Sequence, residues 1–188
     1  MALAIAVVPI GQIDATILHR IRNGLVKVFP ESSCFIVNEQ NEVPKAAYDR
    51  SRKQHRSNYI LGLLQCHARA GIQTANRSLG IVDVDIFIPE LNFVFGEAAV
   101  HGKAALVSLW RLKPEFYGAK SDGELYAQRA LKEAVHEVGH TLGLRHCPRS
   151  SCVMHFSNSI FDTDKKQSLF CDECYLKATL AISGLENT

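Results

Sequence analysis

The sequence has little that would direct the protein to a membrane or to a polyanion. Its formal net charge is only +2 over 188 residues, so electrostatics does not call for nucleic acid or a membrane surface as a partner. The apolar start, Met1 to Pro9, lacks a basic leader and a cleavage site, and it is too short to span a bilayer. We therefore expect a cytoplasmic monomer with no nucleic-acid and no membrane partner.

Internal repeats, low-complexity tracts and the composition typical of disorder are also missing. Apolar residues make up 47% of the chain, which is enough for a buried core at this length. We expect a single domain over residues 1–188, with an upper lobe over about residues 1–143 and a smaller lower lobe over about residues 144–188.

One short stretch, His136 to His146, carries most of the recognisable chemistry. On a helix, His136 and His140 are four residues apart and project from one face, where both imidazoles can bind one metal ion. Gly143 suits the left-handed turn that ends such a helix and returns His146 to the same metal. Three histidine ligands leave a fourth position free for water, which is typical of catalytic zinc.

Glu137 lies beside these ligands in the sequence. From this position it is badly placed to bind the metal, but it can take the proton of a zinc-bound water. The pattern therefore predicts hydrolysis by a water that Glu137 activates as general base.

Six cysteines in a chain without a leader favour metal binding or free thiols over disulfides. Four of them form two close pairs, and four thiolates make a closed tetrahedral zinc site with no room for a substrate. These four are Cys147, Cys152, Cys171 and Cys174. Two disulfides or a redox pair are the alternative interpretation. We expect Cys34 and Cys66 to be small buried hydrophobes, and two Zn²⁺ per chain, one catalytic and one structural.

The stretch from His136 to His146 resembles the zinc-binding helix of the metzincin clan of zinc peptidases. Together with Met154, the four paired cysteines narrow the resemblance to the archaemetzincin family. The resemblance implies a zinc metallopeptidase, a hydrolase that acts on peptide or protein substrates. It also implies that Met154 lies beneath the catalytic metal and shapes an apolar floor there without binding zinc.

The implied fold is an α/β, metzincin-like zincin. It has a mixed five-stranded twisted sheet, an antiparallel edge strand that can bind an extended peptide, an active-site helix and a small irregular C-terminal lobe with the structural zinc. The sequence departs from some members of the clan two residues after Met154, where they have a tyrosine and this chain has Phe156. His155 is a candidate for the missing role of that tyrosine, which is to stabilise the charge of the transition state. The alternative function is therefore a catalytically weak or inactive zinc-containing peptide-binding protein.

Apolar periodicity and capping residues predict the remaining elements. We expect strands over residues 2–8, 33–38, 79–88, 93–100 and 104–112, and helices over residues 14–28, 57–70, 121–142 and 171–184. A capping box, Ser121 to Glu124, should start the main helix. Residues 39–56 are interpreted as a long mobile loop, either a flap that touches substrate or a solvated loop. Asp83 and Asp85 should cap turns or face water, and Leu176 and Leu180 should supply apolar contacts in the last helix.

Overall fold

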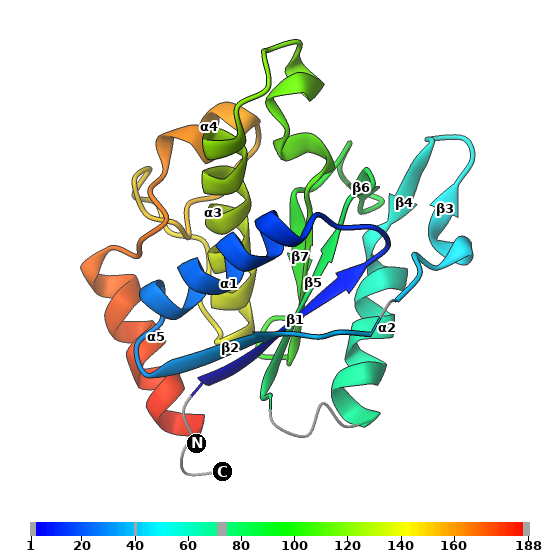
Figure 1. Cartoon of the computed structure of the whole chain (residues 1–188). Helices are drawn as coiled ribbons and strands as arrows, with labels where there is room; N and C mark the ends of the chain where they lie inside the picture. The colour runs from blue at the N-terminus through cyan, green and yellow to red at the C-terminus, as the bar shows by residue number, and fades with distance from the viewer. Residues whose placement is uncertain (1–2, 40, 71–74, 186–188) are drawn as a thin grey trace.

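A five-stranded sheet with the order β2-β1-β5-β8-β7 forms the centre of the molecule (Figure 1). The structure is a computed structural model that describes residues 3–39, 41–70 and 75–185. Four strands are parallel, and β7 runs antiparallel at one edge. The strands are β1 (Leu3–Ile10), β2 (Ser32–Ile36), β5 (Arg77–Val82), β7 (Gly96–Ala98) and β8 (Ala104–Ser108). The predicted mixed sheet with an antiparallel edge strand is confirmed; Ala2 lies outside the described residues.

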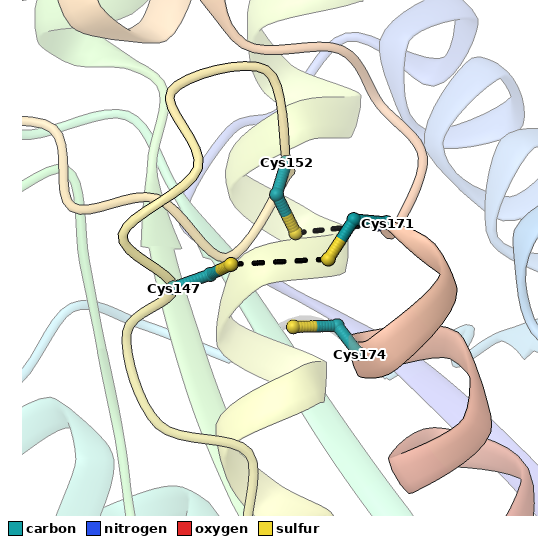
Figure 2. Close-up of side chains that lie close together, drawn as sticks. All are labelled: Cys147, Cys152, Cys171 and Cys174. Carbon is teal, nitrogen blue, oxygen red and sulfur yellow. Dashed lines mark hydrogen bonds between the residues drawn. The ribbon is translucent and has the colours of Figure 1, made fainter.

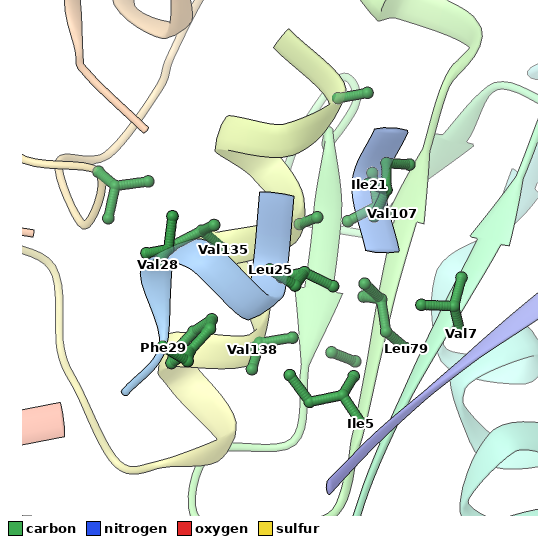
Figure 3. Packing of buried hydrophobic residues seen from close by; sticks show 14 of the residues in the cluster. Ile5, Val7, Ile21, Leu25, Val28, Phe29, Leu79, Val107, Val135 and Val138 are labelled. Carbon is green, nitrogen blue, oxygen red and sulfur yellow. The ribbon is translucent and has the colours of Figure 1, made fainter. Parts of the chain in front are cut away.

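Helices cover both faces of this sheet, which explains why β1 is apolar throughout. Leu3, Ile5 and Val7 pack on one face against α1 (Ala15–Val28) and α3 (Gly123–Thr141), as Figure 3 shows for Ile5 and Val7. The alternate residues of β1 pack on the other face against α2 (Ser57–Ala70). Side chains of a strand alternate between its two faces, so a strand buried on both sides shows no polar positions.

The N-termini of α1 and α3 show how local sequence positions these helices. The carboxylate of Asp14 accepts hydrogen bonds from the backbone N–H groups of Thr16 and Ile17, which is the predicted cap of α1. The main helix, α3, is capped by Asp122, whose carboxylate accepts from the next turn. The prediction of a capping box from Ser121 was therefore one residue too early.

Within the segment predicted as a loop, residues 41–56 are more ordered than we predicted. They contain a short 3₁₀ turn, Lys45–Ala47, and two strands, β3 (Tyr48–Asp49) and β4 (Gln54–Arg56). The two strands are antiparallel, and β4 also pairs in parallel with β6 (Ile86–Phe87), which gives a second, three-stranded sheet. The segment that we predicted as one strand over residues 79–88 is therefore divided between two sheets.

The two aspartates lie in the break between β5 and β6, where both are partly buried and paired with cations rather than free in water. Asp85 receives two hydrogen bonds from the guanidinium of Arg111, at 2.6 and 2.7 Å. Asp83 pairs with the ammonium of Lys113 at 2.6 Å. Both cations come from the chain just after β8, which our interpretation of the aspartates did not anticipate.

The lower lobe holds two helices, α4 (Ile160–Lys165) and α5 (Asp172–Gly184), so the predicted irregular stretch is interrupted by α4. Cys174, Ala178 and Ile182 are the buried residues of α5. Leu176 and Leu180 are 59% and 64% exposed, so the expected apolar contacts of these two leucines were wrong. Among the described residues, no helix combines the length and the apolar character that crossing a membrane requires.

Candidate metal centres

Three histidines meet at the end of α3. His136 and His140 lie on the helix, and the ring nitrogens of both are within 4.8 Å of those of His146. Gly143 has φ of 87°, the left-handed conformation that favours glycine, and this turn brings His146 back. A side chain at Gly143 would also overlap the imidazole of His101, which lies in the turn between β7 and β8. The sequence pattern is thus assembled as predicted.

Hydrogen bonds fix the orientation of two imidazoles. Nδ1 of His136 lies 2.8 Å from the carbonyl of Val153, and Nδ1 of His140 lies 2.7 Å from that of Leu144. Only a protonated Nδ1 can donate to a carbonyl, so both Nε2 atoms are left as acceptors. These two acceptors face each other at 3.1 Å. Tetrahedral zinc with Zn–N bonds of about 2.0–2.1 Å separates two nitrogens by about 3.3 Å, so the donor set fits a zinc ion.

The pKa shifts of the three imidazoles favour the neutral form that binds metals, although only His136 is fully buried, His140 is partly buried and His146 is exposed. Burial, with the nearby Lys166 ammonium as a second cause, holds the pKa of His136 well below its usual value. Burial is also the main cause that lowers the pKa values of His140 and His146.

Glu137 faces a cleft of about 540 Å³ that all three histidines line. Its side chain is buried, and burial, followed by the charge of Glu133, raises its pKa well above the usual value. The carboxylate lies against β7 at Gly96. A Cβ atom at residue 96 would lie 2.5 Å from Cγ and 2.6 Å from Oε1 of Glu137. The absence of a side chain at Gly96 therefore allows the edge strand to approach the glutamate.

The edge strand presents backbone groups to the cleft. Phe95 and Ala99, which flank β7, hydrogen-bond to β8 through their backbones. Hydrogen-bonding direction alternates along an antiparallel strand, so Gly96 and Ala98 direct their N–H and C=O groups to the open edge. Both residues line the cleft. An extended peptide can pair with these groups as an added strand.

Met154 packs against α3 at Gly139, and its position beneath the catalytic metal, which the family resemblance implies, stays a prediction. The residue is fully buried, and a Cβ atom at Gly139 would lie only 2.6 Å from its sulfur. Phe156 lines the cleft, with its ring centre 4.9 Å from that of His146. His155 is not among the residues that line the cleft, and its Nδ1 lies 3.0 Å from the carbonyl of Cys147.

Sequence reasoning missed a buried ion pair beside the histidines. Glu133 lines the cleft one helical turn before Glu137, and its carboxylate lies 3.0 Å from the ammonium of Lys166. The hydroxyl of Thr163 donates to the same carboxylate. These contacts join α3 to α4 and to the residue after it. No local pattern marks them, since the partners are about 30 positions apart in the chain.

The four paired cysteines form the second centre, shown in Figure 2 with all four thiols pointing toward one another. The sulfurs of Cys147 and Cys171 are 3.8 Å apart. A disulfide would need about 2.05 Å, whereas two thiolates on tetrahedral zinc, with Zn–S of about 2.3 Å, lie about 3.8 Å apart. All six cysteines are in the described part of the chain, and none is in a disulfide. The donor set therefore fits zinc, and the disulfide alternative is not supported.

Thiol acidity at this centre is uneven. Burial raises the pKa of Cys171, but hydrogen bonds from the Cys174 backbone and from neighbouring thiols outweigh burial, and the resulting pKa is about 7. Outside the centre, burial raises the pKa of Cys34 to about 12. Cys66 is exposed, so its prediction as a buried hydrophobe was wrong.

Comparisons with known proteins agree with this geometry. The family model described as peptidase family M54 matches residues 20–179. The archaemetzincin of Methanocaldococcus jannaschii is 42% identical, over 94% of this chain and 93% of that protein. The crystal structure of an archaemetzincin from Methanopyrus kandleri has a TM-score of 0.83 at 32% identity, and covers 97% of this chain and 96% of its own. That of a zinc-dependent peptidase from Methanocorpusculum labreanum has a TM-score of 0.84 at 25% identity, with coverage of 93% and 99%.

Proposed function

Because the chain belongs to peptidase family M54, the archaemetzincins, we propose that this zinc metallopeptidase hydrolyses peptide bonds with Glu137 as its general base. The observation that carries the proposal is the position of Glu137. Its carboxylate faces the cleft that the three imidazoles line, and it lies directly against the edge strand at Gly96. Ligands, base and peptide-binding edge are thus adjacent, as peptide hydrolysis requires.

His136, His140 and His146 would hold the catalytic zinc. When bound, zinc supplies a Lewis acid that polarises the peptide carbonyl and makes water more acidic. The backbone groups of Gly96 and Ala98 bind the extended peptide and hold its scissile bond beside Glu137. The Glu137 carboxylate receives the proton of the attacking water and returns it to the leaving amine.

Cys147, Cys152, Cys171 and Cys174 would hold a second, structural zinc. Four protein ligands close the coordination sphere, so this metal has no position for a substrate. Its role is to stabilise the lower lobe, which follows α3 and belongs with it to one catalytic domain. The backbone N–H of Cys147 donates to the carbonyl of Met154 at 2.9 Å, and Cys147 directly follows His146, so the two metal centres share one segment.

Zinc should leave the two centres in two steps. An open site with three imidazoles exchanges metal more readily than a closed thiolate site. Elemental analysis during titration with a mild chelator should therefore show about two zinc ions per chain, followed by a plateau near one. Simultaneous loss of both metals would contradict two independent sites.

Replacement of Gly96 by alanine should displace the Glu137 carboxylate and strain the pairing with β8, because the new methyl group would overlap both Glu137 and the Leu106 carbonyl. We expect the Gly96→Ala variant to retain both zinc ions and to lose activity by about 10- to 100-fold, the usual cost of a misplacement of about 1 Å. Peptide cleavage rates and zinc content check this. Gly62→Ala is the matched control, since a Cβ atom at Gly62 has nothing within 4 Å; equal rates in the two variants would refute the role of Gly96.

A second candidate function is binding of peptides with little hydrolysis. The observation that favours it is Phe156, whose apolar ring lies beside His146 where some members of the clan have a tyrosine hydroxyl. Without this hydroxyl, fewer groups stabilise the negative charge that develops on the peptide carbonyl. The intact Glu137 favours the peptidase, and the experiment that separates the two functions closes the Discussion.

A further inference from the structure

One wall of the cleft is a segment without regular secondary structure. It runs between β6 and β7, and its residues Leu91 to Val94 all line the cleft. Two hydrogen bonds hold it to its own neighbourhood, from Leu91 N–H to the Ile88 carbonyl and from Val94 N–H to the Ile86 carbonyl, both at 3.1 Å. Leu91 and Asn92 are exposed, so this wall needs support from outside the cleft to keep one shape.

Arg52 provides this support from the turn between β3 and β4. Its Nη2 donates to the carbonyls of Leu91 and Asn92, both at 2.9 Å. Its guanidinium also lies 3.9 Å from the ring centre of Phe87, the last residue of β6. The two carbonyls thus point away from the cleft toward a charged donor, and the side chains of the wall are left to face the cleft.

The turn that carries Arg52 is itself well defined. The carboxylate of Asp49 accepts hydrogen bonds from the backbone N–H groups of Ser51 and Arg52, and Nε of Arg52 donates to Oε1 of Gln54 at 3.0 Å. Gln54 is buried and donates from Nε2 to the Asn92 carbonyl at 2.9 Å. The bonds to Asp49 fix the backbone of the turn, and the bond to Gln54 fixes the orientation of the Arg52 guanidinium that contacts the wall.

The wall is also held from the sheet side. Gln54 Nε2 donates to Asp85 at 3.1 Å, and Asp85 is the carboxylate that pairs with Arg111. The guanidinium of Arg111 lies 4.3 Å from the ring centre of Phe93. Three consecutive residues of the wall, Leu91 to Phe93, thus contact two arginines. Arg52 donates to the carbonyls of both exposed residues, and Gln54 donates only to that of Asn92.

From this arrangement we propose that Arg52 is a positioning residue that sets which apolar side chain of a peptide substrate the cleft accepts. The wall offers Leu91, Phe93 and Val94, and its polar carbonyls are directed outward to Arg52, so the matching substrate group is an aliphatic or aromatic side chain. The segment of residues 39–56 acts on the substrate through the wall and not by direct contact. This inference rests on the proposed peptidase function.

Amide hydrogen exchange tests the support of the wall without requiring activity. Arg52→Met keeps most of the apolar stem and removes all side-chain donors, so the hydrogen-bonded amides of Leu91 and Val94 should exchange about tenfold faster or more in the full-length, zinc-loaded protein. Arg50→Met is the matched control, because Arg50 is an exposed residue of the same turn. Arg52→Lys keeps the charge but cannot reproduce the planar fork, and should restore slow exchange only in part. Equal exchange in Arg52→Met and Arg50→Met would overturn the proposal.

Cleavage of a peptide series tests the effect on specificity. The peptides differ only at one residue beside the scissile bond, which is alanine, valine, leucine or phenylalanine. An apolar pocket discriminates such side chains by about 10- to 200-fold in kcat/KM, and Arg52→Met should reduce this range to about threefold at unchanged zinc content. Faster exchange with unchanged discrimination would overturn the role in specificity. If the wild type cleaves none of the peptides, the proposed function fails, and the exchange experiment still decides whether Arg52 holds the wall.

Discussion

Replacement of Cys171 by serine is expected to remove the structural zinc and to unfold the lower lobe. Structural zinc sites supply about 10–16 kcal/mol of apparent binding energy to small folds at neutral pH, and three thiolates hold the metal less well than four. The end of the lobe has few other buried contacts, since α5 buries only Cys174, Ala178 and Ile182, whereas α4 and Lys166 are held to α3 through Glu133. Because the cysteine centre shares a segment with His146 and Met154, activity should fall together with stability.

Thermal unfolding and zinc content measure this effect, and Cys66→Ser is the control. Cys66 is an exposed free thiol on α2, so its replacement should change neither zinc content nor the melting temperature. Cys171→Ser should contain about one zinc ion or fewer and melt at a lower temperature or over a broader range. A Cys171→Ser protein with the melting temperature and zinc content of the wild type would refute the structural role of the centre.

The parts of the fold that could be predicted from the sequence are those set by neighbouring residues. Asp14 starts α1 through bonds within its own first turn, and the spacing of His136 and His140 places both on one helical face. The turn at Gly143 could be predicted in the same way, because its φ of 87° is a conformation that favours glycine. For these reasons the three histidines and four cysteines could be identified before the structure.

The parts that could not be predicted depend on partners far away in the chain. Asp83 and Asp85 look like the polar side of a strand, and only the later positions of Lys113 and Arg111 make them ion pairs. The same holds for Lys166, a buried cation whose partner is on another helix. Helical spacing alone also placed Leu180 in the core, whereas α5 docks through its other face. Periodicity gives a face but does not say which neighbour covers it.

Replacement of Glu137 by glutamine should reduce peptide hydrolysis by about 10²- to 10⁴-fold, the usual contribution of a positioned general base. Glutamine has nearly the same shape, so it should keep the contact with Gly96, but its amide does not accept the proton of the attacking water. Zinc content should stay at the wild-type value, because the histidine and cysteine ligands are unchanged. Glu42→Gln is the control, since Glu42 is exposed and does not line the cleft.

The most direct test of peptide hydrolysis by Glu137 is digestion of a diverse peptide library by the zinc-loaded wild type and by Glu137→Gln, followed by mass spectrometry. We predict cleavage products with the wild type. With Glu137→Gln the amount of product should be lower by a factor of about 10² or more, while both proteins bind the same peptides. Equal cleavage by the two proteins would contradict the role of Glu137. Binding by both proteins without cleavage by either, from mildly acid to mildly alkaline pH, would contradict the peptidase function and identify a peptide-binding protein.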